Sequence, residues 1–435
     1  MRLLVTLTAA LLLAGASVGA QDGVLTVPYE RMVLPNGLTV MLHEDHSTPM
    51  VAVNVWYHVG SAREAPGRTG FAHLFEHIMF EGSGNVPEGA FDEWLEAAGG
   101  FNNGSTTTDR TNYYEMVPRS ALELALFLES DRMGFLLDAM SPEKVDGQRG
   151  VVKNERRQSY ENRPYGLAYL TLSENLYPPE HPYHWPVIGS QEDLSAAMVI
   201  AGDIDPEETK RLIEHWFGDV PAGPPVGPLD GPAASLTEEK RIVLEDRVQL
   251  PRLYMCWLSP PIFAPGDAEL EIAGDVLAGG KNARLYKRLV YDLQVAQDVS
   301  AYQSSAELQS EFCIIATARS GHGLTEIEGL IQEELDRLKA EGPADREVQR
   351  AVNQNKAGFL SQLESILGKA DRLNNYHFRT GNPDYFNEDL ARYRAVVPVD
   401  IQAMVQTYLR NDARVILSIV PEGKPELAAG RPVSE

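Results

Sequence analysis

A proline-rich stretch near the middle of the chain divides it into two similar parts. Residues 221–232 hold five prolines and three glycines, a composition that supports neither a helix nor a central strand. The parts on either side have about 200 residues each, which is enough for one domain. We therefore expect a fold built from two domains joined by a linker.

The two parts repeat one order of elements, so we interpret them as homologous copies. In each part strands come first, helices follow, and a final strand closes the pattern. This order is typical of α+β folds, and we predict two homologous α/β sandwich domains, each a mainly antiparallel sheet with helices packed on it. The expected strands are Arg31–Val33, Leu38–His43, Val51–Val59, a pair within Asn102–Val117, Val199–Ala201, Leu253–Leu258, Val299–Ser304, Glu311–Ala318 and Val415–Val420.

The copies differ in length near their final strands. The second copy has a predicted helix, residues 400–409, between Leu390 and its last strand. The first copy reaches its last strand almost directly after Leu194, and is about 20 residues shorter at this place. A helix of the first domain is therefore expected to be missing.

The charge balance limits the partners of the protein. The chain has 62 Asp and Glu against 38 Lys and Arg, a formal net charge of −24. Nucleic-acid binding needs a cationic surface that displaces counterions from phosphates, so we expect no nucleic-acid partner. The same balance permits attraction of basic peptides.

The first twenty residues have the pattern of an export signal. Arg2 supplies a positive n-region, Leu3–Ala14 an apolar h-region, and Val18–Ala20 a small-residue cleavage site. We expect an exported protein, periplasmic or secreted, without a membrane span, and an uncleaved anchor is the alternative. The expected organisation is a signal peptide (1–20), an N-terminal domain (21–220), a linker (221–240), a C-terminal domain (241–423) and a tail (424–435).

The two cysteines of the chain, Cys256 and Cys313, exclude a disulfide framework. Both lie in apolar, strand-like stretches, where cysteine commonly behaves as a small buried hydrophobe. A single disulfide between them is the alternative.

The segment His73-Leu74-Phe75-Glu76-His77 carries the strongest chemical signal. Residues i and i+4 of a helix lie about 5–6 Å apart on one face, so His73 and His77 can share one metal ion. Glu76 lies on the neighbouring flank, and the string is H-E-x-x-H read backwards. Two imidazoles and a third ligand hold zinc with a position open for water, and an unligated carboxylate can take a proton from that water.

The third ligand should be acidic and should come from another helix. Residues 144–160 are predicted to be helical, and Glu143 and Glu161 at the ends of this helix are weak candidates. Without the histidine motif, Glu155 could equally be a solvated carboxylate paired with arginine. It is favoured as a ligand because four residues share one inward face at spacings i, i+3, i+4 and i+7: Gln148, Val151, Val152 and Glu155.

The sequence resembles the pitrilysin, insulysin and mitochondrial processing peptidase family. The resemblance implies that His73, His77 and Glu155 bind one zinc ion per chain and that Glu76 is the general base of an endopeptidase. It also implies two homologous domains that form half of a clam shell around a chamber for peptides. The resemblance runs from Arg31 to about Pro421 and is carried by the segments Gly67–Gly82 (GRTGFAHLFEHIMFEG), Phe101–Tyr114 (FNNGSTTTDRTNYY), Val151–Arg157 (VVKNERR) and Pro164-Tyr165-Gly166.

The segment Phe101–Tyr114 is predicted to contain an exposed, glycine-rich edge strand. An extended peptide can add to such an edge through its backbone, which gives loose sequence selectivity. By the resemblance, the substrate backbone pairs at Asn103, Gly104 and Ser105. On the local sequence alone, a strand or turn without a ligand is the alternative.

Two features depart from the pattern of active relatives. Those relatives hold the substrate carbonyl with an Arg and a Tyr from a second-half segment of the form L-R-E-x-x-G-L-A-Y, whereas Val290 and Gln297 stand at those places here. In the paired-subunit branch of the family, a partner chain supplies these groups. We therefore expect this chain to be the zinc-bearing subunit of a heterodimer with a homologous non-zinc chain, and a homodimer is less favoured. The second departure is the shortening after Leu194.

Two hypotheses follow for the function. The first is an exported zinc endopeptidase subunit that hydrolyses peptides or small unfolded polypeptides in an enclosed chamber. The second is a catalytically silent structural or peptide-binding subunit of the same family, which the absent Arg and Tyr and the shortened segment favour. The intact set of zinc ligands favours the enzyme.

Overall fold

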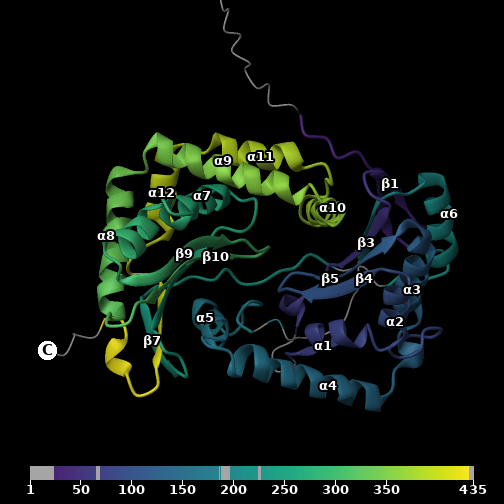
Figure 1. Ribbon diagram of the computed structural model, residues 1–435, viewed down its shortest axis with the longest axis horizontal. Coiled ribbons are helices and arrows are strands. Elements are labelled where there is room, and N and C mark those ends of the chain that lie inside the picture. The colour runs from purple at the N-terminus through teal and green to yellow at the C-terminus, as the bar shows by residue number, and fades with distance from the viewer. Residues whose placement is uncertain (1–23, 65–68, 186, 188–195, 224–226, 431–435) are drawn as a thin grey trace, which may run out of the picture.

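The computed structural model describes residues 24–64, 69–185, 187, 196–223 and 227–430. Within these residues the chain forms a six-stranded and a five-stranded sheet with helices packed on them, which confirms the predicted α+β class (Figure 1). The predicted signal peptide (1–20) and Leu194, after which the first copy is expected to be shortened, lie outside the described residues.

The first sheet is formed by the N-terminal half. Its strands are antiparallel to their neighbours except β2 and β6, which run parallel. In spatial order they are β1 (Glu30–Val33), β2 (Thr39–Glu44), β6 (Ala196–Gly202), β3 (Met50–Tyr57), β5 (Thr111–Pro118) and β4 (Phe101–Thr106). This order leaves β4 at one edge of the sheet.

The second sheet is formed by the C-terminal half and repeats this plan. It is also antiparallel except for one parallel pair, β7 with β11. Its spatial order is β7 (Lys240–Asp246), β11 (Val415–Pro421), β8 (Arg252–Ser259), β10 (Ser310–Ala318) and β9 (Ala296–Ser304). The edge strand β9 corresponds in position to β4.

The helices follow the strands in both halves, as the sequence pattern predicts. None of the described helices is long and apolar enough to cross a membrane. Two segments, Arg157–Glu161 and Tyr286–Asp292, are π-helical. The α-helices are α1 (Phe71–Ile78), α2 (Ala90–Ala97), α3 (Leu122–Phe135), α4 (Pro142–Arg156), α5 (Ala168–Leu176), α6 (Pro206–Phe217), α7 (Asp267–Ala278), α8 (Leu324–Glu341), α9 (Asp345–Gln362), α10 (Ile366–Thr380), α11 (Phe386–Ala395) and α12 (Pro398–Tyr408).

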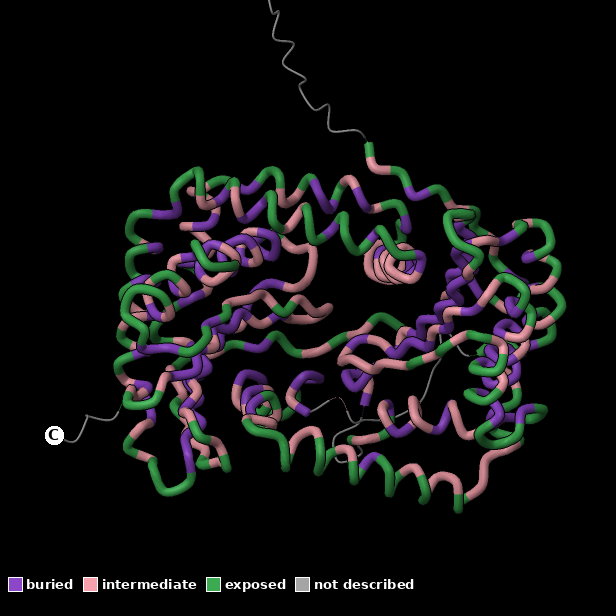
Figure 2. Tube along the Cα trace, in the orientation of Figure 1, coloured by how far each residue is buried: buried purple, intermediate pink, exposed green. Residues whose placement is uncertain are grey.

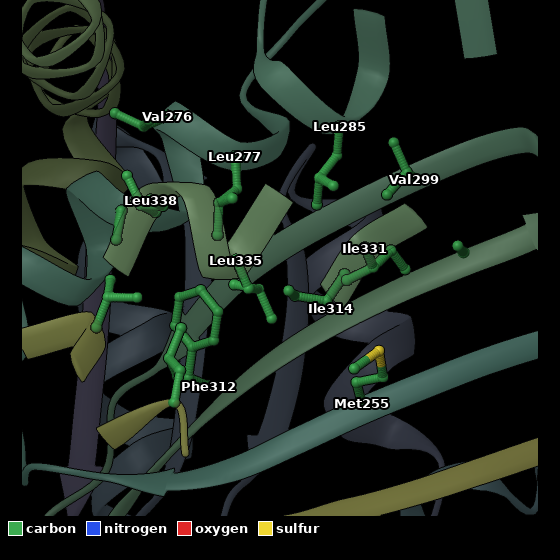
Figure 3. Close-up of a cluster of buried hydrophobic side chains, with 14 of the residues drawn as sticks. Met255, Val276, Leu277, Leu285, Val299, Phe312, Ile314, Ile331, Leu335 and Leu338 are labelled. Atoms are coloured by element: carbon green, nitrogen blue, oxygen red, sulfur yellow. The ribbon is translucent and has the colours of Figure 1, made fainter. Parts of the chain in front are cut away.

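One face of each sheet packs against helices of its own half. In the first half, Val53 and Val55 of β3 share a core with Leu74 of α1 and Leu126 of α3. In the second half, strands β8 and β10 meet helix α8 in the same manner (Figure 3). The residues in that contact include Met255, Phe312, Ile314, Ile331, Leu335 and Leu338.

The other face of the first sheet is covered by a helix from the C-terminal half. Met41 and Ala52, which point away from the first core, pack with Leu373 and Tyr376 of α10. Figure 1 shows α10 beside β3, far in sequence but close in space. Since strand side chains alternate between faces, β3 is buried on both of them, which explains why its sequence is apolar apart from the buried Asn54.

The second sheet is likewise covered by a helix from the other half, because α5 of the N-terminal half packs on it. Leu172 and Leu176 of α5 pack with Tyr254 and Leu417 of β8 and β11. Figure 2 shows the buried residues concentrated on the strands of both sheets, with exposed residues on the outward sides of the helices. The two halves are therefore interlocked through their cores as well as joined by the linker.

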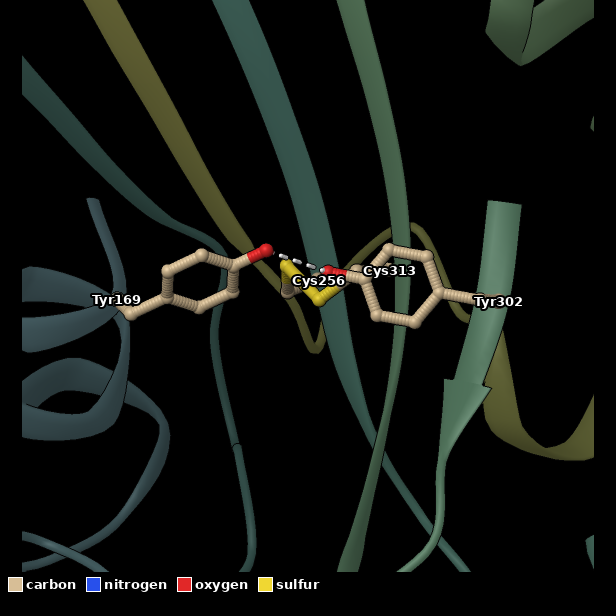
Figure 4. Close-up of a disulfide and its surroundings, with 4 residues drawn as sticks. All are labelled: Tyr169, Cys256, Tyr302 and Cys313. Carbon is tan, nitrogen blue, oxygen red and sulfur yellow. Dashed lines mark hydrogen bonds between the residues drawn. A yellow bond between two sulfur atoms is a disulfide. The ribbon is translucent and has the colours of Figure 1, made fainter. Parts of the chain in front are cut away.

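The cysteines form one disulfide, which decides between the two alternatives. Cys256 on β8 lies directly opposite Cys313 on β10, with their Cα atoms 4.2 Å apart. Beside them the hydroxyls of Tyr169 and Tyr302 are 3.1 Å apart (Figure 4). The bond joins neighbouring strands of one sheet and does not link the two halves.

Candidate metal centre and active site

Helix α1 presents the predicted metal-binding motif on its polar face. The helix begins after Gly70, whose φ of 112° is a left-handed conformation that favours glycine. Its apolar residues Ala72, Leu74 and Ile78 are buried, which anchors one side of the helix in the first core. The opposite side, with His73, Glu76 and His77, is half-buried and turned toward α4 and β4.

The structure brings the three predicted ligands together. The Nε2 atoms of His73 and His77 are 3.3 Å apart. Oε2 of Glu155, in the last turn of α4, lies 3.5 Å from His73 Nε2 and 3.2 Å from His77 Nε2. Among the described residues, these form the group of His, Cys and acidic side chains close enough to hold one metal ion.

The spacing of these atoms fits zinc. Ligands bound at about 2.0–2.1 Å in a tetrahedral site are about 3.3 Å from one another. The separations of 3.2, 3.3 and 3.5 Å match that value. Two imidazoles with one carboxylate is also a ligand set found in catalytic zinc sites, where the fourth position stays open. The residues present therefore fit zinc.

Burial favours the neutral form of the His73 side chain, which is the form that binds a metal. Removal from water lowers the pKa of His73 below its ordinary value, against the opposing attraction of Glu155 and Glu76. The imidazole therefore stays neutral near pH 7, and the neutral form is the one that binds a metal.

The face of α4 differs in part from the sequence-based expectation. Val152 is 7% exposed and packs in the first core, but Val151 is 46% exposed. The buried face of α4 is therefore narrower than the sequence pattern predicts, because Val152 faces the core and Val151 faces solvent. Glu155 remains on the side of α1. Of the weaker candidates, Glu161 pairs with Arg156 at 3.5 Å instead of joining the ligands.

Glu76 is held against the edge strand β4. Its Oε2 accepts a hydrogen bond of 2.5 Å from the Thr106 hydroxyl. A Cβ atom added at Gly104 would lie 3.2 Å from Glu76 Cγ and 3.3 Å from Oε1. The absence of a side chain at Gly104 thus leaves the space that the Glu76 carboxylate occupies.

The edge of β4 offers backbone groups to a peptide. The Thr107 amide donates to the Arg110 carbonyl at 2.8 Å, which makes these two a hydrogen-bonded pair. Because such pairs alternate along antiparallel strands, the amides and carbonyls of Gly104 and Thr106 point to the open edge. The Gly104 amide is held by Asn103 Oδ1 at 2.8 Å.

Of the three predicted substrate-binding residues, Gly104 thus faces the edge through its backbone. The Ser105 side chain lies on the opposite face of the strand from Glu76, where its hydroxyl and carbonyl accept hydrogen bonds from Arg110. Sequence reasoning missed Thr106. The signal available was its spacing of two from Gly104, which places both residues on one face of the strand.

Two family profiles match most of the chain. One, described as Insulinase (Peptidase family M16), matches residues 39–178. The other, described as Peptidase M16 inactive domain, matches residues 193–355. The chain belongs to the M16 peptidase family.

Relatives of this M16 chain are named zinc proteases. It is 27% identical over 404 residues to the zinc protease PqqE of Helicobacter pylori, covering 86% of this chain and 88% of that protein. It is 24% identical over 413 residues to the uncharacterized zinc protease YmxG of Bacillus subtilis, covering 91% and 98%. A crystal structure of a protease from Helicobacter pylori shares the fold, with a TM-score of 0.83 at 23% identity and coverage of 91% and 100%.

The second-half positions expected to carry Arg and Tyr differ in environment. Val290 lies in the π-helical segment Tyr286–Asp292 and packs against the second core. Gln297 is exposed near the start of the edge strand β9. A valine side chain has no hydrogen-bond donor, so this position cannot replace the expected arginine.

Proposed function

We propose that this M16 protein is a zinc-dependent endopeptidase subunit that hydrolyses peptides or small unfolded polypeptides inside an enclosed chamber. The observation that carries the proposal is the triangle of ligand atoms from His73, His77 and Glu155, at separations of 3.2–3.5 Å. Glu76 lies beside this triangle, on the helix that carries His73 and His77, and is not one of the candidate ligands. Metal ligands with an adjacent free carboxylate are the arrangement that peptide hydrolysis needs.

In the proposed mechanism, His73, His77 and Glu155 would hold the zinc ion and Glu76 would transfer protons. Bound zinc would supply Lewis acidity that polarises the peptide carbonyl and acidifies a water molecule. Glu76 would accept the proton that this water loses as its oxygen bonds to the carbonyl carbon. The same carboxyl group would pass the proton to the amide nitrogen as the carbon–nitrogen bond breaks. The products are a free carboxylate and a free amine.

The substrate would bind as an extra strand on β4. Because the backbone groups of Gly104 and Thr106 point to the open edge, recognition would depend on the peptide backbone, with Asn103 and Ser105 flanking it. A flexible or unfolded chain can adopt the extended form that such pairing requires. We therefore expect loose selectivity for sequence and strong selectivity against folded proteins.

A homologous partner chain would complete the active site. A tetrahedral oxyanion needs hydrogen-bond donors, and loss of one such donor costs about 10²–10³ in rate. Val290 offers none, and Gln297 stands where relatives have a tyrosine. We propose a heterodimer in which the non-zinc partner supplies Arg and Tyr.

Export of the protein would agree with its disulfide. Disulfides persist in oxidising compartments and are rare in the reducing cytosol. The Cys256–Cys313 bond and the signal pattern of residues 1–20 both support a periplasmic or secreted location.

The test is cleavage of a quenched fluorogenic peptide library by the zinc-loaded protein, alone and mixed with a homologous chain that carries the Arg and Tyr. We expect cleavage in the mixture, and a loss of about 10²–10⁴-fold in kcat for Glu76→Gln with zinc retained, the usual contribution of a general base. Cleavage by the protein alone would refute the need for a partner, and full activity of Glu76→Gln would refute the mechanism. Zinc binding without cleavage in either sample would favour the structural or peptide-binding subunit.

A further inference from the structure

We infer that Thr106 is a positioning residue that fixes the Glu76 carboxylate at the edge where the peptide binds. The inference rests on the proposed function, because it assigns a role to a residue beside the general base. It starts from the 2.5 Å hydrogen bond between Thr106 Oγ1 and Glu76 Oε2. Thr106 acts through Glu76 and need not touch the reacting atoms.

The surrounding hydrogen bonds direct the Thr106 proton to Glu76. Its other polar neighbour is the hydroxyl of Thr111, at 3.2 Å. Thr111 donates to the Val59 carbonyl at 2.9 Å, so its own proton is engaged there. Each hydroxyl has one proton to donate. An ionised carboxylate is a stronger acceptor than a neutral hydroxyl, which leaves Glu76 as the acceptor for Thr106.

The hydrogen bond and the neighbouring glycine together restrict the Glu76 side chain. Thr106 holds Oε2, while the strand backbone at Gly104 lies close under Cγ and Oε1. A glutamate side chain has three rotatable bonds, so without such contacts it would populate several rotamers. The two residues select the conformer in which the carboxylate lies against β4.

The same strand would hold the substrate backbone. The outward carbonyls of Gly104 and Thr106 and the amide of Thr106 are the groups a peptide strand would pair with, and the Gly104 amide would exchange its bond to Asn103 Oδ1 for one to the peptide. Thr106 would therefore bind the peptide through its backbone and hold the base through its side chain. This shared anchor fixes the distance between the scissile carbonyl and Glu76, which is the geometric requirement for general-base catalysis.

The experiment compares Thr106→Val, which keeps the shape but removes the hydroxyl, with Thr106→Ser, which keeps the hydroxyl. One hydrogen bond to a charged group corresponds to about 10- to 100-fold in rate. We expect kcat to fall by about that factor in Thr106→Val, with KM, zinc stoichiometry and melting temperature unchanged, and to recover in Thr106→Ser. Thr407→Val is the matched control, because Thr407 donates to the Ala403 carbonyl on an exposed side of α12.

A second readout does not need catalysis. In the Glu76→Gln background, the affinity for a labelled peptide is measured by fluorescence anisotropy, with and without Thr106→Val. We expect equal affinities, since the side chain of Thr106 acts on the base. Weaker peptide binding in the double variant, or a wild-type kcat in Thr106→Val while Glu76→Gln is inactive, would overturn the positioning role alone. Full activity of Glu76→Gln would instead overturn the proposed function.

Discussion

Both halves of the molecule place a helix against the edge strand of their own sheet, with different outcomes. In the first half, α1 lies against β4 and presents His73, Glu76 and His77. In the second half, α7 lies against β9, and the positions at the same spacing are Glu271, Gly274 and Asp275. Within the described residues, the metal-binding group lies in the first half.

The second half uses the space between helix and strand for direct packing. A Cβ atom at Gly274 would lie 2.9 Å from the Ala301 carbonyl of β9, so the helix and the strand backbone are in contact. Glu271 is already engaged by the Tyr393 hydroxyl at 2.5 Å and the Asn355 amide at 3.0 Å. Burial raises the pKa of Glu271, which further disfavours the charged form that a metal needs.

The two halves also differ in where the glycine at this contact lies. In the first half the glycine is on the strand, at Gly104, and the helix carries Glu76 in the space it leaves. In the second half the glycine is on the helix, at Gly274, and the helix has no side chain to place there. In the first half, the carboxylate beside the candidate ligands therefore lies against the strand that carries the small residue.

The largest expected effect comes from removing the third ligand. Glu155→Gln should weaken zinc binding by about 10²–10⁴-fold, since one of three protein ligands is lost, and kcat/KM at limiting zinc should fall in proportion. Chelator competition with metal analysis measures this. Asn355→Ala on α9, which reaches α7 as Glu155 reaches α1, is the control and should leave zinc affinity unchanged. An unaltered affinity in Glu155→Gln would remove it from the ligand set.

The interlocked cores predict that both halves unfold together. Leu373 of α10 and Leu172 of α5 are buried on the sheet of the opposite half. Leu373→Ala and Leu172→Ala should each reduce the free energy of unfolding by about 2–5 kcal/mol and shift one common transition in calorimetry. Leu360→Ala, at an exposed position, should change it by less than about 0.5 kcal/mol. Two separate transitions, with each variant lowering only one, would contradict the interlock.

The smallest effects come from a matched pair of glycine substitutions. Gly274→Ala meets a backbone carbonyl that cannot move alone, and should reduce the free energy of unfolding by about 1–3 kcal/mol with kcat unchanged. Gly104→Ala meets the Glu76 side chain, which can shift by a few tenths of an ångström, so kcat should change by about two- to five-fold at most. Thermal melting measures the stability of both variants, and steady-state kinetics measure their kcat. A large stability loss in Gly104→Ala would show that β4 is packed as tightly as β9.

Much of the site could be predicted because its determinants are local. The four-residue spacing of His73 and His77 places both side chains on one helix face, which follows from helix geometry alone. Glu155 could be selected from the periodicity of its helix, but the exposure of Val151 could not, because it depends on how α4 docks on the rest of the first half. Thr106 was missed because its contact with Glu76 joins residues 30 positions apart.

Much of the fold could be predicted in the same way, except for what covers each sheet. The mostly apolar sequence of β3 is typical of a strand buried on both faces, but it does not identify the elements that cover it. The exchange of α5 and α10 between the halves depends on contacts between residues far apart in the sequence, such as the 2.9 Å hydrogen bond from Asn374 of α10 to the Asn54 carbonyl of β3. Sequence periodicity reports which face of an element is apolar and not which other element packs on it.

The sequence by itself determined the duplicated α+β plan, the paired imidazoles and the adjacent carboxylate, because each depends on spacings within one helix or strand. The sequence favoured Glu155 as the third ligand, and the tertiary structure brought its carboxylate within 3.2 Å of His77. The tertiary structure alone decided that Cys256 lies opposite Cys313 and that Thr106 reaches Glu76. These outcomes depend on the register and docking of separate elements. Register and docking are set by the packing of whole cores, which no single segment encodes.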